Sequence, residues 1–170
     1  MVTLADIEAA RDRIAGAVYY SPCVESVTLS QLTGAHIWCK LDYLQRTGSF
    51  KERGARNALL LLSPEQRRRG VIAASAGNHA QGIAYHAQLL GIPTTVVMPV
   101  FAALIKVTNC RQFGANVVLH GADLTEARAH AGEIAVRDGL TFIHPFDNAA
   151  VIAGQGTMGL EILEQTPDVE

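Results

Sequence analysis

The second half of the chain alternates short apolar runs with longer segments in which apolar and polar residues share a helical period. The apolar runs lie at residues 71–75, 94–98, 116–120 and 141–144. Between them, the pattern predicts helices over residues 78–90 and 103–113, and a third helix capped by Asp123 and Glu126. Apolar strands that alternate with helices are typical of a parallel sheet covered on both faces. We therefore predict an α/β protein with a Rossmann-like parallel sheet and helices on both faces, spanning residues 70–147.

The first half of the chain has shorter and less regular elements. Thr3 can cap a helix with one apolar face, made of Leu4, Ile7, Ile14 and Val18. Residues 36–41 alternate as in a strand, whereas residues 29–32 are too short a stretch to assign. Ser63 and Pro64 predict the start of a short helix that Gly70 ends.

A short polar segment, residues 47–55, has the sequence TGSFKERGA. Ser49, followed three residues later by Glu52, is typical of a capping box and predicts a helix from Ser49 through Leu62. Lys51 would then lie in the first turn, where exposed N–H groups disfavour an ammonium by roughly 0.3–1 kcal/mol. A lysine with an available amine is what Schiff-base chemistry needs. If only its position in the helix is considered, Lys51 could equally be a solvated surface lysine.

A second candidate segment follows the first strand of the predicted sheet. In an open parallel sheet, ligands bind beyond the carboxyl ends of the strands, and the N-terminus of the next helix offers N–H groups to an anion. Gly77 permits a tight turn there, and the Asn78 amide can both donate and accept hydrogen bonds. The alternative is a structural turn with Asn78 as a cap. We interpret His79 as a hydrogen-bonded structural residue rather than an acid or base.

Composition narrows the class of protein. A hydrophobic content of 49% predicts a globular protein. The net charge of −2 gives no electrostatic reason to expect binding to nucleic acid or to a membrane. No apolar run reaches the roughly 18 residues of a membrane span, and no basic leader precedes an apolar core, so we predict a cytoplasmic protein. The spacing of the cysteines and histidines predicts no metal site.

Together, the two segments resemble motifs of the serine/threonine dehydratases, within the fold-type II pyridoxal-phosphate enzymes: Ser-Phe-Lys-x-Arg-Gly-Ala and Ser-x-Gly-Asn-His. The resemblance implies pyridoxal 5′-phosphate as cofactor, with Lys51 as the catalytic lysine that binds it and Phe50 packed beside its ring. It implies that Asn78 bonds the 3′-hydroxyl oxygen of the cofactor. The substrate carboxylate would be received by the loop that consists of Ser75, Ala76, Gly77, Asn78 and His79.

The implied reaction converts L-threonine to 2-oxobutanoate and ammonia, or L-serine to pyruvate. Racemases of the same superfamily carry a serine where Ala76 stands, so an alanine favours elimination over racemisation. A serine racemase or β-replacement enzyme and a non-catalytic α/β module remain as alternatives. A nicotinamide-binding domain is disfavoured because the first strand-to-helix turn lacks Gly-x-Gly-x-x-Gly spacing. Biosynthetic and degradative roles stay open, isoleucine biosynthesis being one of them.

The resemblance covers most of the chain and implies two domains. Residues 1–69 and 148–170 would be part of a large cofactor-binding domain, and residues 70–147 would form a small one, with residues 154–157 as a hinge and close-packing segment between them. In the family, a Gly-rich loop that cradles the cofactor phosphate would fall just past Glu170. We therefore expect a truncated enzyme, with little activity from residues 1–170 alone and a homo-oligomer in the intact enzyme.

Overall fold

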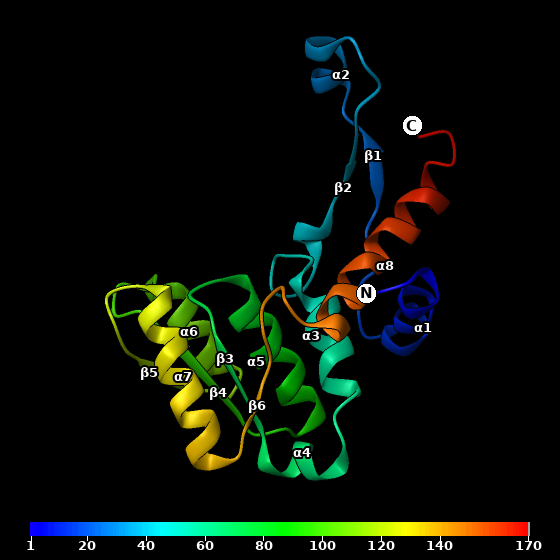
Figure 1. The fold of residues 1–170 in the computed structure, drawn as a ribbon. Coiled ribbons are helices and arrows are strands. Elements are labelled where there is room, and N and C mark those ends of the chain that lie inside the picture. The colour runs from blue at the N-terminus through cyan, green and yellow to red at the C-terminus, as the bar shows by residue number, and fades with distance from the viewer. Residues whose placement is uncertain (170) are drawn as a thin grey trace.

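The computed structural model describes residues 1–169, and the larger of its two sheets has four strands in the order β5-β4-β3-β6 (Figure 1). The strands are β3 (Val71–Ala74), β4 (Thr94–Met98), β5 (Asn116–Leu119) and β6 (Thr141–Phe142). Every pair of neighbouring strands is parallel. The predicted parallel sheet is confirmed, and each strand begins at the residue that the apolar pattern indicated.

Helices cover both faces of this sheet, as predicted. They are α5 (Asn78–Leu90), α6 (Leu104–Gln112) and α7 (Leu124–Asp138). Successive residues of a strand point to opposite faces. Accordingly, Ile72 packs in one cluster with Ala127 and Ala131 of α7, whereas Val71 packs in another with Ile83 of α5. The alternation explains why β3 is buried along its whole length and reads as a continuous apolar run.

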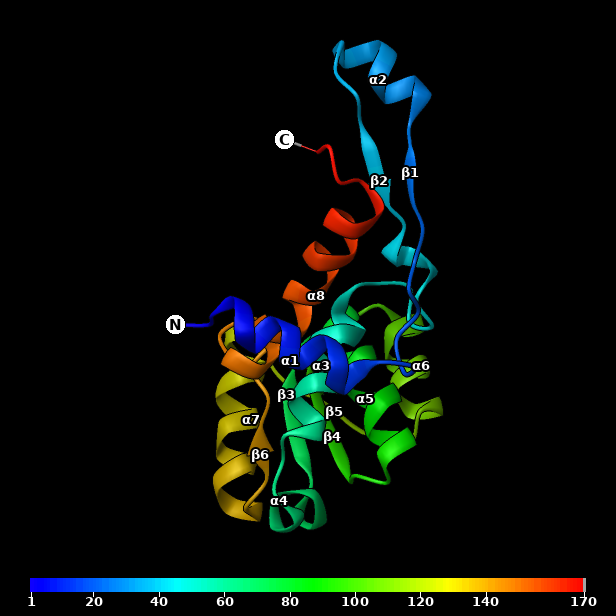
Figure 2. The same ribbon diagram turned by 90° about the vertical axis from the view of Figure 1, so that its right-hand side faces the viewer.

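The remaining elements form a second body and a projecting arm. The body contains α1 (Leu4–Ile14), α3 (Lys51–Leu60), α4 (Pro64–Arg69) and α8 (Ala149–Gln165). The arm contains β1 (Cys23–Glu25), α2 (Val27–Thr33) and β2 (Trp38–Lys40), and the short 3-10 helix η1 (Asp42–Leu44) follows it. β1 and β2 pair in antiparallel fashion and carry α2 at the far end of the arm (Figures 1 and 2).

Helix α1 agrees with the sequence prediction at its start but not along its whole face. Thr3 and Asp6 form a capping box, with the Thr3 N–H donating to the Asp6 carboxylate at 2.8 Å. The helix ends at Ile14, so Val18 lies outside it, and Leu4 is exposed. The short helix α4 begins as predicted, with Ser63 as its N-cap and Pro64 as its first residue.

The contact between α3 and α8 is close enough to require glycine on both helices. A Cβ added to Gly54 would lie 2.6 Å from the Val151 carbonyl oxygen, and one added to Gly154 would lie 2.6 Å from the Gly54 Cα. Gly154 therefore packs closely, as predicted, but against α3 of the same predicted domain and not between the two domains. The prediction of the segment 154–157 as a hinge is wrong in placement, because these residues lie inside the continuous helix α8 rather than between elements.

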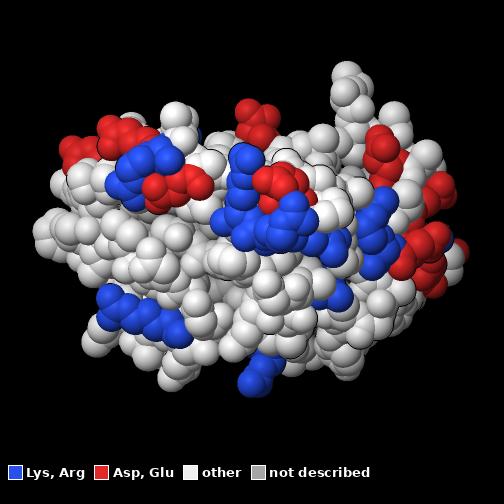
Figure 3. Space-filling model, turned by 90° about the horizontal axis from the view of Figure 1, so that it is seen from below, with Lys and Arg blue, Asp and Glu red and all other residues white. Residues whose placement is uncertain are grey.

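Charged side chains of both signs share the surface. In α4, Arg69 pairs with Glu65 at 2.8 Å, and Arg68 pairs with the same carboxylate. Figure 3, which views the molecule from the end where α4 lies in Figure 1, shows basic and acidic side chains side by side. Within residues 1–169, no helix has both the length and the apolar character that crossing a membrane would require.

Candidate active site

The strand order places the carboxyl ends of β3 and β6 next to each other. From β3, the chain proceeds through β4 and β5 on one side and returns to β6 on the other, so the direction of strand addition reverses between β3 and β6. Ligands of open parallel sheets bind at such a reversal, beyond the carboxyl ends of the strands. The loops that meet here are residues 75–77, which lead into α5, and residues 143–148, which lead into α8.

Lys51 reaches one of these loops from outside the sheet. It is the first residue of α3, as the sequence predicted for the first turn, and its Nζ donates to the Pro145 carbonyl oxygen at 3.0 Å. The Nζ atom also lies 5.3 Å from the centroid of the Phe50 ring. The Lys51 side chain is half-buried, and this burial lowers the pKa of its amine. The neutral amine is therefore easier to reach than that of a solvated lysine.

The helix start itself differs from the predicted capping box. The N-cap position is Phe50, which makes no side-chain cap, and the Ser49 hydroxyl accepts from the Lys51 N–H at 3.3 Å. The Glu52 carboxylate accepts from the N–H of Thr47 and not from that of Ser49. Glu52 is buried, so tertiary contacts set its orientation, and the capping-box assignment is wrong. The helix also ends at Leu60, two residues before the predicted Leu62.

The loop after β3 leads directly into α5. Gly77 is the N-cap residue, and its N–H donates to the Ser75 hydroxyl at 3.3 Å. Asn78 is the first residue of the helix rather than its cap, and its side chain is exposed. Its Oδ1 accepts from Lys106 Nζ of α6 at 2.8 Å. The Asn78 amide thus points outward at the sheet edge, where it can contact a ligand.

His79 ties the two loops together. Its ring is almost completely buried, and Nε2 lies 3.1 Å from the carbonyl oxygen of Ile143, at the end of β6. Burial lowers the pKa of His79 to about 4, so the ring is neutral at neutral pH. The geometry agrees with the interpretation of His79 as a hydrogen-bonded structural residue. Ala76, in the loop before α5, is half-buried.

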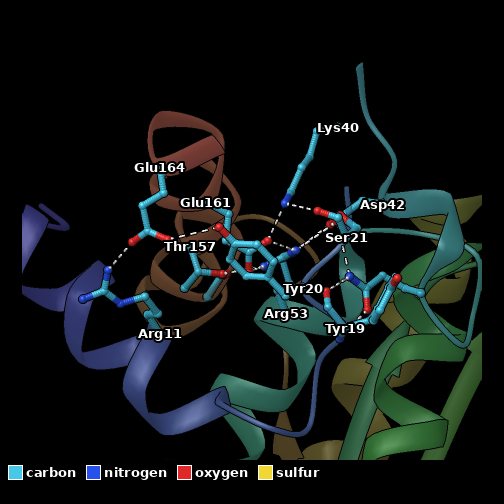
Figure 4. A network of polar contacts seen from close by, with 12 residues as sticks. Arg11, Tyr19, Tyr20, Ser21, Lys40, Asp42, Arg53, Thr157, Glu161 and Glu164 are labelled. Atoms are coloured by element: carbon cyan, nitrogen blue, oxygen red, sulfur yellow. Dashed lines mark hydrogen bonds and ion pairs between the residues drawn. The ribbon is translucent and has the colours of Figure 1, made fainter. Parts of the chain in front are cut away.

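Behind Lys51, a network of buried charges fixes α3 to its surroundings (Figure 4). Arg53 is fully buried and donates to both carboxylate oxygens of Asp42 at 2.7 and 2.9 Å, and to both of Glu161 at 2.6 and 2.8 Å. Lys40 Nζ lies 2.6 Å from Glu161, so two cations balance two anions. Burial alone would raise the pKa of Asp42, but hydrogen bonds from Arg53 and Ser21 outweigh it and leave the pKa below its ordinary value.

Sequence reasoning placed the main candidate residues but missed their neighbours. Lys51 and the loop after β3 do meet at one edge of the sheet, through the loop after β6. The roles of the Pro145 carbonyl, of Lys106 and of the Arg53 network were not assigned from sequence. A usable signal existed for Pro145, because it follows the strand next to β3. None existed for Arg53, whose partners lie 11 and 108 residues away along the chain.

Comparisons with known proteins agree with this arrangement. Residues 14–170 match a family described as pyridoxal-phosphate dependent enzyme. The chain is 51% identical over 170 residues to an L-threonine ammonia-lyase of Thermotoga maritima, and 47% identical over 165 residues to a catabolic L-threonine dehydratase of Staphylococcus aureus. A solved structure of serine racemase from Dictyostelium discoideum matches with a TM-score of 0.91 and 37% identity, over 99% of this chain and 55% of that one.

The matches to the two threonine enzymes cover 100% and 96% of this chain but 42% and 48% of those proteins, so the chain spans less than half of their length. The family match nevertheless extends over most of the chain, including α3, the sheet and α8. The chain therefore belongs to the fold-type II pyridoxal-phosphate-dependent enzymes, in the family that includes the threonine ammonia-lyases.

Proposed function

We propose that this chain forms the lysine-bearing part of a threonine dehydratase, which removes the β-hydroxyl of L-threonine and yields 2-oxobutanoate and ammonia. The observation that carries the proposal is the half-buried Lys51 amine, whose pKa burial lowers, at the reversal point of the sheet. The names of the two threonine enzymes support the choice of reaction. L-serine would give pyruvate by the same elimination.

The residues at the sheet edge fit pyridoxal 5′-phosphate. Lys51 offers an amine that is easily deprotonated, Phe50 offers an aromatic ring next to that amine, and Asn78 offers an exposed amide. We infer that Lys51 would hold the cofactor through its aldehyde carbon, that Phe50 would lie beside the pyridine ring and that Asn78 would hydrogen-bond the 3′-hydroxyl oxygen. When bound, this cofactor supplies an electron sink for a carbanion at the substrate Cα.

The chain's own residues would then bind the substrate and move its protons. The loop that receives the substrate carboxylate consists of Ser75, Ala76, Gly77, Asn78 and His79, and the N-terminus of α5 favours an anion there. Lys51 would remove the Cα proton, since a neutral amine can accept one near neutral pH. Neutral His79 would hold the loop against β6 and take no proton itself.

The remaining inferences concern the intact protein. We infer that residues 1–69 and 148–170 belong to a large cofactor-binding domain and that residues 70–147 form a small one. We also infer that the intact enzyme is a cytoplasmic homo-oligomer. The phosphate-binding loop would lie in the part of the relatives that this chain does not cover. Isoleucine biosynthesis is one role for the reaction. Threonine breakdown is the other, and the name of the Staphylococcus aureus relative favours it for that protein.

Racemisation is the second candidate activity, because a serine racemase is among the structural neighbours. It needs a proton donor on the face of the Cα opposite the lysine. Alanine at position 76 has no proton to give, and this residue favours elimination. The test uses a protein of the same length as the relatives that carries these residues, and measures the D-serine and the pyruvate that it makes from L-serine. The ratio of the two products separates racemisation from elimination. D-serine as the main product would refute the dehydratase assignment.

A labelling experiment tests the role of Lys51 in the chain itself. The sequence has three lysines: the Lys40 side chain is buried and paired with Glu161, Lys106 bonds Asn78, and burial lowers the pKa of Lys51. Pyridoxal phosphate followed by borohydride marks each lysine in proportion to its reactivity, and peptide mass spectrometry reads the positions. We expect Lys51 to be labelled first. Equal labelling of Lys51 and Lys106 would contradict the proposal and favour a non-catalytic α/β module.

A further inference from the structure

Lys106 has no role in the chemistry described so far, yet it holds a residue that does. It is the third residue of α6, and its Nζ donates to Oδ1 of Asn78, the first residue of α5, at 2.8 Å. Within residues 1–169, no other side chain bonds the Asn78 amide. The contact therefore joins a half-buried cation to an exposed amide at the edge of the sheet.

The chemistry of lysine fixes which end of this amide faces α6. A lysine side chain carries donors and no acceptor when it is charged, so the amide atom beside Lys106 must be the oxygen of Asn78. Oδ1 and Nδ2 lie on opposite branches of the planar amide, and Nδ2 therefore points away from Lys106. In the part of the chain that the structure describes, no group accepts a hydrogen bond from Nδ2. The donor end of Asn78 is thus available to a ligand.

Helix α6 is held firmly enough against α5 to keep Lys106 in place. Asn109, three residues after Lys106, donates through its Nδ2 to Oε1 of Gln81 on α5 at 2.7 Å. Val107 is buried and packs in one apolar cluster with Ala84 of α5. Two side-chain hydrogen bonds, about one helical turn apart, therefore cross between these helices above a shared apolar contact.

Asn78 also lies near the helix that carries Lys51. Gly82 is four residues after Asn78, and residues four apart lie on the same face of a helix. A Cβ added to Gly82 would lie 3.3 Å from the Lys51 carbonyl oxygen, so this face of α5 rests against the first turn of α3. Gln81, by contrast, faces α6. Asn78 thus stands between the two sides, and turning its oxygen towards α6 leaves its nitrogen on the side of Lys51.

We propose that Lys106 is a positioning residue that locks the Asn78 amide, so that the site presents a hydrogen-bond donor to the ring oxygen of the cofactor. The proposal rests on the proposed function. A hydrogen bond from an amide to an ionised oxygen is stronger than one between neutral groups. An unlocked amide would turn its own oxygen towards the ligand part of the time, and two acceptors repel each other. Lys106, acting through Asn78, therefore selects for a ligand with an acceptor atom at this point.

The lock can be tested in the chain without any ligand. Nitrogen relaxation in NMR gives the order parameter of the Asn78 side-chain amide, which falls when the amide becomes mobile. Lys106→Met removes the donor at nearly constant length and should lower this order parameter, whereas Lys106→Arg keeps a donor and should restore it. Asn109→Ala breaks the neighbouring bond between α6 and α5 but leaves the Asn78 contact. It should leave the Asn78 amide ordered.

A pair of probes tests whether the lock serves the ring oxygen. Pyridoxal phosphate and an analogue without the 3′-oxygen are each fixed to Lys51 with borohydride, and the ratio of the two labelling yields is compared between variants. Both probes carry the same phosphate, so its attraction to protein charges cancels in the ratio. Lys106→Met should reduce the advantage of the oxygen-bearing probe roughly 2- to 10-fold. Arg111→Met is the matched control, because it removes an exposed cation from the same helix; the ratio should not change.

The outcomes separate the lock from the proposed function. An Asn78 amide that stays ordered in Lys106→Met, or that Asn109→Ala loosens equally, overturns the lock. A probe ratio that is unchanged in Lys106→Met, or that falls as far in Arg111→Met, overturns it as well. Loss of the preference for Lys51 over Lys106 in the unchanged chain would instead contradict the proposed function. The relaxation measurement uses no ligand and would still decide whether Lys106 locks the amide.

Discussion

Two clusters of ionisable groups lie on either side of the first turn of α3. One cluster stabilises the charged form of its buried base, whereas the other favours the neutral form. Behind the turn, Arg53 is fully buried and stays charged because Asp42 and Glu161 face it. In front of the turn, Lys51 and His79 are buried to different degrees and face backbone carbonyl oxygens, and within residues 1–169 no carboxylate bonds to either. Their pKa values are lowered by burial. Partners, more than depth, decide whether a buried base keeps its proton here.

The largest expected effect comes from removing the partner of the buried carboxylates. Arg53→Ala leaves Asp42 and Glu161 buried without their main cation, which typically destabilises a protein by about 3–5 kcal/mol. Urea unfolding measures the difference. The control is Arg11→Ala, because Arg11 and Glu164 form a surface pair at 3.0 Å that should contribute about 0–1 kcal/mol. Equal losses in the two variants would show that the buried network is no stronger than a surface pair.

The second largest effect on stability is expected when the pH is lowered, because His79 then takes up a proton. The folded-state pKa is about 4, below the ordinary value of 6.5, so the unfolded chain takes up the proton first as the pH falls. The stability that neutral His79 contributes is fully present above pH 6.5 and is lost between pH 6.5 and about 4, by about 1–3 kcal/mol. Unfolding measured across this range should show a flatter profile in His79→Gln. An unchanged profile would mean that His79 does not titrate on unfolding.

The spacing between α3 and α8 can be disturbed without changing any charge. Gly54→Ala adds a methyl group where the Val151 carbonyl and the Gln155 side chain are 2.6 Å away, and overpacking of this kind costs about 1–3 kcal/mol. The matched control is Gly159→Ala, in α8, where nothing lies within 4 Å of the added atom. That change should stabilise the protein by about 0.4–1 kcal/mol. A neutral Gly54→Ala would show that the two helices can separate freely.

The smallest effect on stability is expected at the residue that matters most for chemistry. Lys51→Met removes one hydrogen bond to the Pro145 carbonyl and a partly desolvated amine, so the free energy of unfolding should change by less than about 1 kcal/mol. Labelling by pyridoxal phosphate should then fall to the level that Lys106 shows. A loss of stability comparable to that of Arg53→Ala would place Lys51 in the structural cluster instead.

The sequence predicted the sheet better than it predicted the site. Strand starts at Val71, Thr94, Asn116 and Thr141, and the whole of helix 78–90, follow from apolar period and glycine positions, which are local signals. The Ser49 cap failed because Glu52 turns towards Thr47 and His86, and that choice depends on a helix 34 residues away. The Arg53 network joins residues of β2, η1, α3 and α8, a pairing that no local pattern encodes.

The hydrogen bond between Lys51 and Pro145 has a consequence for recognition. An amine that rests on a backbone carbonyl occupies a defined position before any ligand arrives, and a group that captures it must first break that bond. Such a bond contributes about 0.5–1.5 kcal/mol, so competition from the carbonyl lowers the apparent affinity by roughly 2- to 10-fold. The same contact restricts the conformations of the Lys51 side chain, so less conformational entropy is lost when the amine binds a ligand. The Pro145 carbonyl thus competes weakly with a ligand for the Lys51 amine and also orients the Lys51 side chain.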